Sequence, residues 1–205
     1  TPGEKPEFTH DPHVWTDVKQ AYVQVFNIGT ALEKTQSDNP AAADSIKAAV
    51  EKYEAQLTLL DQWVRDSISS VPEENRVLFT SHDAFGYFAN AYDVKFIGAA
   101  LSDFNHQQDA TAEHINKAAE EVKASGAKAL FAENSNNSKS IEAIARAAGV
   151  KAITNDDALY GDSLGPAGSP GETYIGSIIH NVTTLVTAWD GTPAPLPPEI
   201  SNNAK

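Results

Sequence analysis

Short apolar segments alternate with helical patterns between residues 76 and 153, and this alternation limits the fold more than any other feature of the chain. The expected strands cover residues 76–80, 95–101, 129–132 and 150–153. The expected helices cover residues 84–91, 110–124 and 138–149. Strands that alternate with helices in this way form a parallel sheet with helices on its faces. The sequence therefore predicts an α/β, Rossmann-like lobe with a four-stranded parallel sheet.

A longer helical pattern precedes this region. Apolar residues between Ile46 and Ile68 recur at alternating spacings of four and three, which is typical of an amphipathic helix. Asn39 is the expected N-cap, and Pro40 stands at the first helical position. A helix over residues 40–70 would be about 45 Å long. It could lie on a core, or it could be long enough to connect two lobes.

Composition divides the chain into four expected parts. Residues 1–12 are rich in proline, glycine and charge and are predicted to form a flexible lead-in. Residues 13–70 form a helical segment that includes the long helix, and residues 71–190 form the α/β lobe with a last helix from about Thr173 to Trp189. Residues 191–205 contain four prolines by position 198, so a tail outside the core is expected.

Charge and cysteine content exclude several function classes. The formal net charge of −13 argues against nucleic-acid binding and against docking on an anionic membrane. The chain has no cysteine, which excludes disulfides, thiolate zinc sites and cysteine nucleophiles. No stretch approaches the ~18 consecutive apolar residues of a membrane-spanning helix. The chain also has no methionine, so we expect a processed or truncated product.

Metal-ligand side chains occur where the expected fold can bring them together. His82 directly follows the first strand, and Asp162 lies in the loop after the fourth. His13 lies in the connection that leads into the helical segment. Because ligands of open α/β sheets bind beyond the carboxyl ends of the strands, these side chains are expected to gather at one edge. Two neutral imidazoles and a carboxylate suit a transition metal, and Glu133, after the third strand, is a candidate fourth ligand.

Other chemistry remains open at this point. Ser81, His82 and Asp83 are not a catalytic triad, because triads assemble from distant positions. Three protein ligands with an open position are also typical of a zinc hydrolase, in which Glu133 would be the general base. A surface adhesion or partner-binding module with no metal role is a third hypothesis.

Three motifs together resemble one protein family. They are Asp-Pro-His-Val-Trp at 11–15, Thr-Ser-His-Asp-Ala-Phe-Gly-Tyr-Phe at 80–88 and Leu-Tyr-Gly-Asp-Ser-Leu-Gly at 159–165. In this order they resemble the solute-binding proteins of bacterial zinc and manganese ABC importers (the cluster A-I, ZnuA/TroA/PsaA-like family). The resemblance implies two α/β lobes, one long helix between them and a metal held between the lobes. Residues 40–70 then resemble the linking helix and residues 77–190 the C-terminal lobe, and the N-terminal lobe is absent.

The resemblance also implies a function. His13, His82 and Asp162 match the family's metal ligands, and another histidine ligand comes from the N-terminal lobe in the family. The implied protein is extracytoplasmic, in the periplasm or on the cell surface, and delivers Zn²⁺ or Mn²⁺ to an ABC transporter permease without catalysing a reaction. It would meet the membrane only through a lipid anchor absent from this chain, and a cell-adhesion role is compatible with it. Because His82 is an imidazole, Zn²⁺ is favoured over Mn²⁺, which prefers more oxygen ligands.

Overall fold

A computed structural model describes residues 10–101 and 111–203 of the protein. Its strands form one sheet in the order β2-β1-β3-β4, and every neighbouring pair is parallel. The strands are β1 (Val77–Thr80), β2 (Lys95–Ala99), β3 (Ala129–Phe131) and β4 (Lys151–Ile153). The predicted α/β fold with a four-stranded parallel sheet is confirmed.

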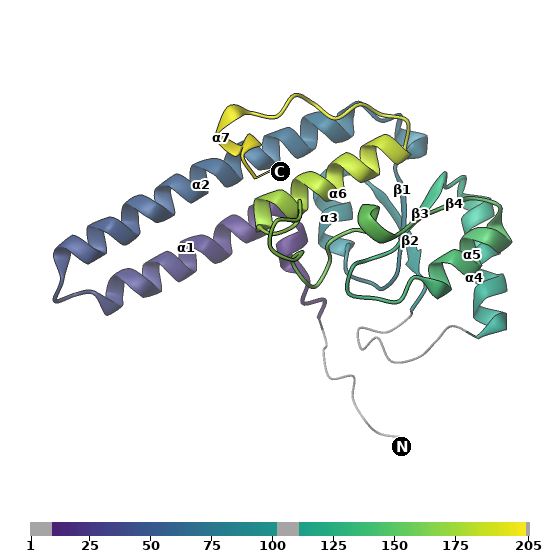
Figure 1. Cartoon of the computed structure of the whole chain (residues 1–205), viewed down its shortest axis with the longest axis horizontal. Helices are drawn as coiled ribbons and strands as arrows, with labels where there is room; N and C mark the ends of the chain where they lie inside the picture. Colours follow the sequence, from purple (N-terminus) through teal and green to yellow (C-terminus); the bar gives the residue numbers. More distant parts are fainter. Residues whose placement is uncertain (1–9, 102–110, 204–205) are drawn as a thin grey trace, which may run out of the picture.

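Helices cover both faces of the sheet (Figure 1). One face packs on α4 (Ala112–Ser125) and α5 (Lys139–Ala148), and the other packs on α3 (Gly86–Tyr92) and α6 (Tyr174–Ala188). Successive side chains of a strand point to opposite faces, so Phe79 belongs to the first core and Leu78 to the second. Both residues are fully buried, as expected for a parallel sheet that is covered on both sides.

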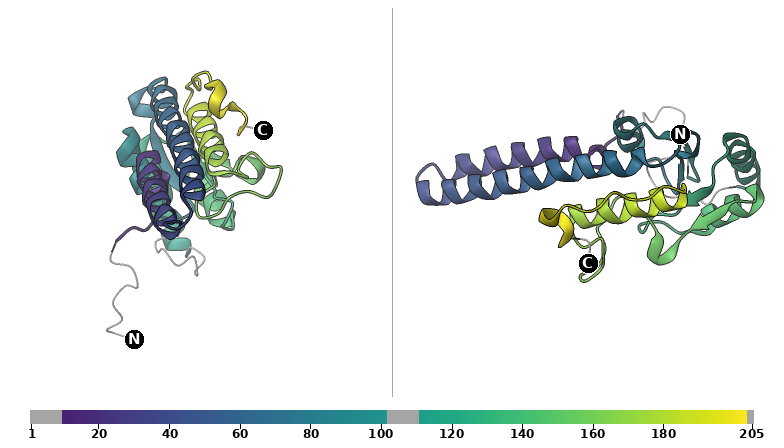
Figure 2. Two further views of the ribbon diagram at one scale, coloured as in Figure 1. Left: turned by 90° about the vertical axis from the view of Figure 1, so that its left-hand side faces the viewer. Right: turned by 90° about the horizontal axis from the view of Figure 1, so that it is seen from above.

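Two antiparallel helices, α1 (Val18–Thr35) and α2 (Pro40–Ser69), form a hairpin that extends away from the sheet (Figures 1 and 2). The predicted start of α2 is confirmed, because the Asn39 side chain accepts a hydrogen bond from the backbone N–H of Ala42. The two helices approach closely at Gly29, where an added Cβ would lie 2.6 Å from a methyl carbon of Val50. Among the described residues, no helix combines the length and the apolar character needed to cross a membrane.

Much of α1 has little cover in the described part of the chain. Val23, Phe26, Ile28 and Leu32 are between 47% and 59% exposed. The buried residues of α1 are Val18, Ala21 and Gly29, so only a narrow stripe of this helix is covered by the described residues.

The chain after α6 packs against the core. Residues 191–203 run back along α2 and include the short helix α7 (Pro198–Ser201) (Figure 1). Ile200 is fully buried, and Trp63 of α2 donates its indole N–H to the carbonyl oxygen of Ala194. The expectation that this segment contributes nothing to the core is therefore wrong, because its extended, proline-rich backbone follows the helix closely enough to bury an isoleucine. Residues 1–9 of the expected lead-in lie outside the described residues.

Candidate metal site

Two neighbouring strands end beside the candidate site. His82 follows β1 and Glu133 follows β3, and both side chains are buried, with 0% and 1% of the residue exposed. Within the sheet, β1 has β2 as its neighbour on one side and β3 as its neighbour on the other, so the chain passes from β1 to β2 and then returns past β1 to β3. This is a topological switch point, where open α/β sheets leave a crevice for a ligand.

Asp162 reaches the same edge by a return of the chain. After β4 and the short 3₁₀ helix η3 (Asn155–Asp157), Leu159 pairs in parallel with Glu133. Asn181 of α6 then fixes the next residue, because its side-chain amide accepts from the backbone N–H of Tyr160 and donates to its carbonyl oxygen, each at 2.8 Å. The loop that carries Asp162 is thereby anchored two residues before the carboxylate.

A local turn positions His13. The Asp11 carboxylate accepts a hydrogen bond from the backbone N–H of His13 at 2.9 Å, and the same oxygen lies 2.6 Å from Nδ1 of the ring. The hydroxyl of Thr16, at the end of the 3₁₀ helix η1 (Val14–Thr16), donates to the His13 carbonyl oxygen. The ring is buried, with 4% of the residue exposed. An aspartate that bonds its own chain two residues on is a common turn, so Asp11 could have been found from the sequence.

His13, His82 and Asp162 come together at one point. One ligand atom from each lies within 4.8 Å of the other two. The Nε2 atom of His13 is 3.3 Å from one oxygen of the Asp162 carboxylate, and Nε2 of His82 is 3.2 Å from the other. Two ligand atoms that are each about 2.1 Å from a tetrahedral zinc ion would lie about 3.4 Å apart, so these separations suit a shared ion.

Carboxylates also lie beside the Nδ1 atoms of the two histidine rings, on the side away from the Nε2 atoms that face Asp162. Nδ1 of His13 faces Asp11, and Nδ1 of His82 lies 2.7 Å from Glu133 and 3.1 Å from the side-chain amide of Asn136. The other Glu133 oxygen accepts from the backbone N–H of His82. Glu133 therefore lies on the side of the His82 ring that faces away from Asp162, and its atoms are not part of the three-residue cluster. Its predicted place at the strand end is correct, but its carboxylate orients His82 instead of joining the cluster.

The charges around the cluster are mostly negative. Burial lowers the pKa of His82, but the hydrogen bond and charge of Glu133, followed by those of Asp162, outweigh it and raise the pKa above its ordinary value. Burial and the charge of Asp11 raise the pKa of Asp83. Carboxylates that raise the pKa of a neighbouring imidazole make a local environment that favours a cation.

Comparison with known proteins identifies the family. The family described as "ZnuA: Zinc-uptake complex component A periplasmic" matches residues 2–188. This chain belongs to that family. Within the ZnuA family, the manganese-binding lipoprotein MntA of Bacillus subtilis is 34% identical over 182 residues, which are 88% of this chain and 58% of MntA. The zinc-binding protein TroA of Treponema pallidum is 33% identical over 187 residues, which are 90% of this chain and 58% of TroA.

The structural comparison agrees with the sequence comparison. The solved structure of periplasmic zinc-binding TroA from Treponema pallidum superimposes with a TM-score of 0.77 and 33% identity over 87% of this chain and 64% of that one. The chain thus spans about 58% of the length of the curated relatives it matches. The family and these relatives are described by zinc uptake, manganese binding and zinc binding, and these descriptions support neither the hydrolase hypothesis for Glu133 nor the adhesion module without a metal.

Proposed function

We propose that His13, His82 and Asp162 of this chain capture a divalent transition-metal ion outside the cytoplasm, for delivery to an ABC transporter permease. One observation carries the proposal: the two Nε2 atoms face the two oxygens of a single carboxylate, at 3.3 Å and 3.2 Å. Each ring also has a carboxylate at Nδ1, which favours the tautomer that carries its proton on Nδ1 and its ligating electron pair on Nε2. Metal-binding histidines are usually held by such a partner.

We propose zinc as the preferred cargo. Two imidazoles and one carboxylate suit Zn²⁺ better than Mn²⁺, which favours oxygen ligands. The relatives include one protein named for manganese and one named for zinc, so the ligand set of this chain is the argument for zinc. The ion is a transported ligand here and has no catalytic role.

The partner and the location follow from the same relatives. The family description places its members in the periplasm, and MntA is described as a lipoprotein. We therefore propose an extracytoplasmic protein.

We also keep the four-part division of the chain as a proposal: 1–12, 13–70, 71–190 and 191–205. Both helices of the hairpin fall in the second part and all four strands in the third, which supports these limits. The last part is redefined as a segment that packs along α2. Under this division α2 is the long helix that connects α1 to the lobe.

Calorimetry tests the proposed function directly. The protein is freed of metal with a chelator, dialysed and titrated with ZnCl₂, and in a second experiment with MnCl₂. We expect one ion per chain and tighter binding of zinc than of manganese. The absence of saturable zinc binding by the folded protein would rule out the proposal, and tighter manganese binding would rule out the preference.

Replacing Glu133 with glutamine is expected to weaken zinc binding by about 10- to 100-fold, the usual cost of losing a partner behind a metal-binding histidine. The amide keeps the size of the carboxylate but removes the charge that faces Nδ1 of His82. Competition with a fluorescent zinc chelator measures the change. Glu142→Gln is the matched control, since Glu142 accepts a hydrogen bond from Ser138 and does not contact the cluster. Equal zinc affinity for Glu133→Gln and the unchanged protein would contradict the prediction.

A further inference from the structure

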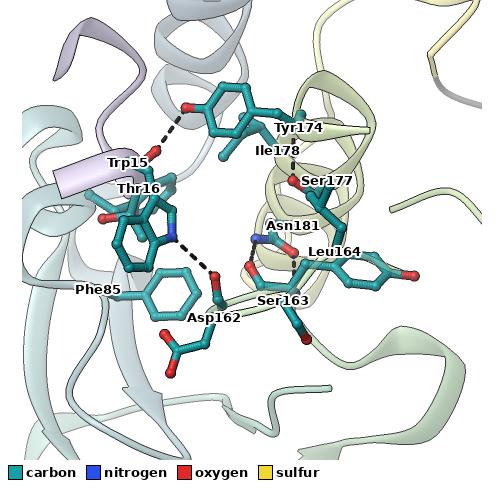
Figure 3. Close-up of a pocket in the computed structure, with 13 residues that line it drawn as sticks. Trp15, Thr16, Phe85, Asp162, Ser163, Leu164, Tyr174, Ser177, Ile178 and Asn181 are labelled. Atoms are coloured by element: carbon teal, nitrogen blue, oxygen red, sulfur yellow. Dashed lines mark hydrogen bonds between the residues drawn. The ribbon is translucent and has the colours of Figure 1, made fainter. Parts of the chain in front are cut away.

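A tryptophan side chain joins the segments that carry His13 and Asp162. The indole Nε1–H of Trp15 donates to the carbonyl oxygen of Gly161 at 3.1 Å, across 146 residues of sequence. Tyr174, the first residue of α6, donates its hydroxyl to the carbonyl oxygen of Trp15 at 2.8 Å. Figure 3 shows both contacts as dashed lines. We call these two hydrogen bonds the Trp15 bridge.

The Trp15 bridge lies next to the candidate ligands along both segments. Trp15 is two residues after His13, and Gly161 is the residue directly before Asp162. The rings of His13 and Trp15 meet edge to face, with centroids 5.4 Å apart. A displacement of the Trp15 side chain would therefore move a ligand on each side of the cluster.

One hydrogen bond and an edge contact with the His13 ring hold the Trp15 ring beside an open space. The ring borders a cavity of about 280 Å³ that is also lined by Phe85, Leu164 and Ile178 (Figure 3). Leu164, in the loop that follows Asp162, is 52% exposed, so the loop contributes little packing of its own. With open space on one side, the indole could adopt another rotamer if its N–H lost the Gly161 carbonyl.

The backbone at Gly161 has little freedom to compensate. A Cβ added at Gly161 would overlap the carboxylate of Glu133, which shows how closely this backbone approaches the group behind His82. Burial, followed by the charges of Tyr53 and Asp17, raises the pKa of the Tyr174 hydroxyl well above its ordinary value. The hydroxyl thus stays protonated and remains a donor at neutral pH.

We propose that Trp15 and Tyr174 are positioning residues that hold the His13 and Asp162 segments at their metal-binding separation before an ion arrives. The inference rests on the proposed function, because it assigns these residues a role at the same site. A site that is already assembled loses less conformational freedom when it binds its ligand. Removal of the bridge lets the Asp162 loop leave the two imidazoles, so the ion is lost faster.

The test replaces Trp15 with phenylalanine, which keeps an aromatic ring and removes the N–H. We expect zinc affinity to fall about 10-fold, mainly through faster dissociation, which stopped-flow mixing with a chelator measures. Tyr174→Phe is expected to weaken zinc binding about 3-fold, as for one neutral hydrogen bond. In the metal-free protein, hydrogen exchange at the amides of residues 161–171 should become faster in Trp15→Phe.

Trp63→Phe is the matched control, because it removes an equivalent indole N–H bond to the carbonyl oxygen of Ala194, away from the cluster. It should leave zinc dissociation unchanged, whatever its effect on thermal stability. Unchanged zinc dissociation and loop exchange in Trp15→Phe would overturn the positioning role while the unchanged protein still binds zinc. An equal effect of Trp63→Phe on zinc dissociation would also overturn it. Failure of the unchanged protein to bind zinc would overturn the proposed function and this inference together.

Discussion

Replacing His82 with alanine is expected to weaken zinc binding by about 100- to 1,000-fold. Zinc sites with four protein ligands have apparent binding free energies of about 10–16 kcal/mol, so one ligand contributes about 2.5–4 kcal/mol, and each 1.4 kcal/mol is tenfold. His82 is fully buried and its Nε2 lies 3.2 Å from Asp162, so water cannot easily replace it without rearrangement. Competition with zinc chelators of graded affinity covers this range.

The same competition measurement distinguishes residues that bind zinc from residues that do not. His13→Ala and Asp162→Ala should cause losses of the same order, because both residues belong to the cluster. His114→Ala is the control, since His114 lies in the first turn of α4, on the face of the sheet remote from α6. Zinc affinity that survived all three cluster substitutions, with the fold intact by circular dichroism, would show that the cluster does not bind the ion.

Acidification from pH 7.5 to 5.5 is expected to weaken zinc binding by at least about 10-fold. Zinc must displace the proton of an imidazole ligand, and at one pH unit below the reference imidazole pKa of about 6.5 this costs about tenfold for one ring. The pKa of His82 is raised, so proton competition at this ring begins above pH 6.5. A raised pKa also means that protonation of His82 stabilises the metal-free fold at low pH, and this contribution is lost as the pH rises through the folded value.

Calorimetry at several pH values, in buffers with different ionisation enthalpies, measures the affinity and the protons released together. We expect more protons released per zinc ion at pH 5.5 than at pH 7.5. Circular dichroism at both values shows whether the fold persists. Equal zinc affinity at the two pH values would mean that the imidazoles are not ligands.

The fold was largely predictable because its signals are local. The four strands are short apolar runs between polar residues, and the Asn39-Pro40 pair marks the start of α2. Ligands of open α/β sheets bind beyond the carboxyl ends of the strands, and this rule depends only on strand order and direction. It therefore predicted from the sequence that His82 and Asp162 lie at one edge of the sheet, where the structure has them close together.

Long-range contacts were beyond the sequence. The direction of the Glu133 carboxylate depends on the backbone N–H of His82 and on Ser81, whose hydroxyl accepts from the Glu133 N–H across 52 residues. The burial of Ile200 depends on the return of the chain along α2, and the proline-rich composition of residues 191–205 does not indicate this path. The contact between Trp15 and Gly161 joins two loops, and no periodic pattern relates loops to each other.

The burial of α2 is uneven along its length. Every buried residue of this helix falls between Leu57 and Ile68, where α6 and the returning segment accompany it, and none falls in the first half. Local stability increases with the number of buried apolar contacts. The part of α2 near the sheet is therefore expected to be the more stable part, and local unfolding is expected to begin at the turn near Asn39. In mechanical terms the hairpin is a cantilever: because the bending moment of a beam loaded at its tip is largest at the fixed end, such a load would act most strongly at the base, where α1 begins five residues after His13.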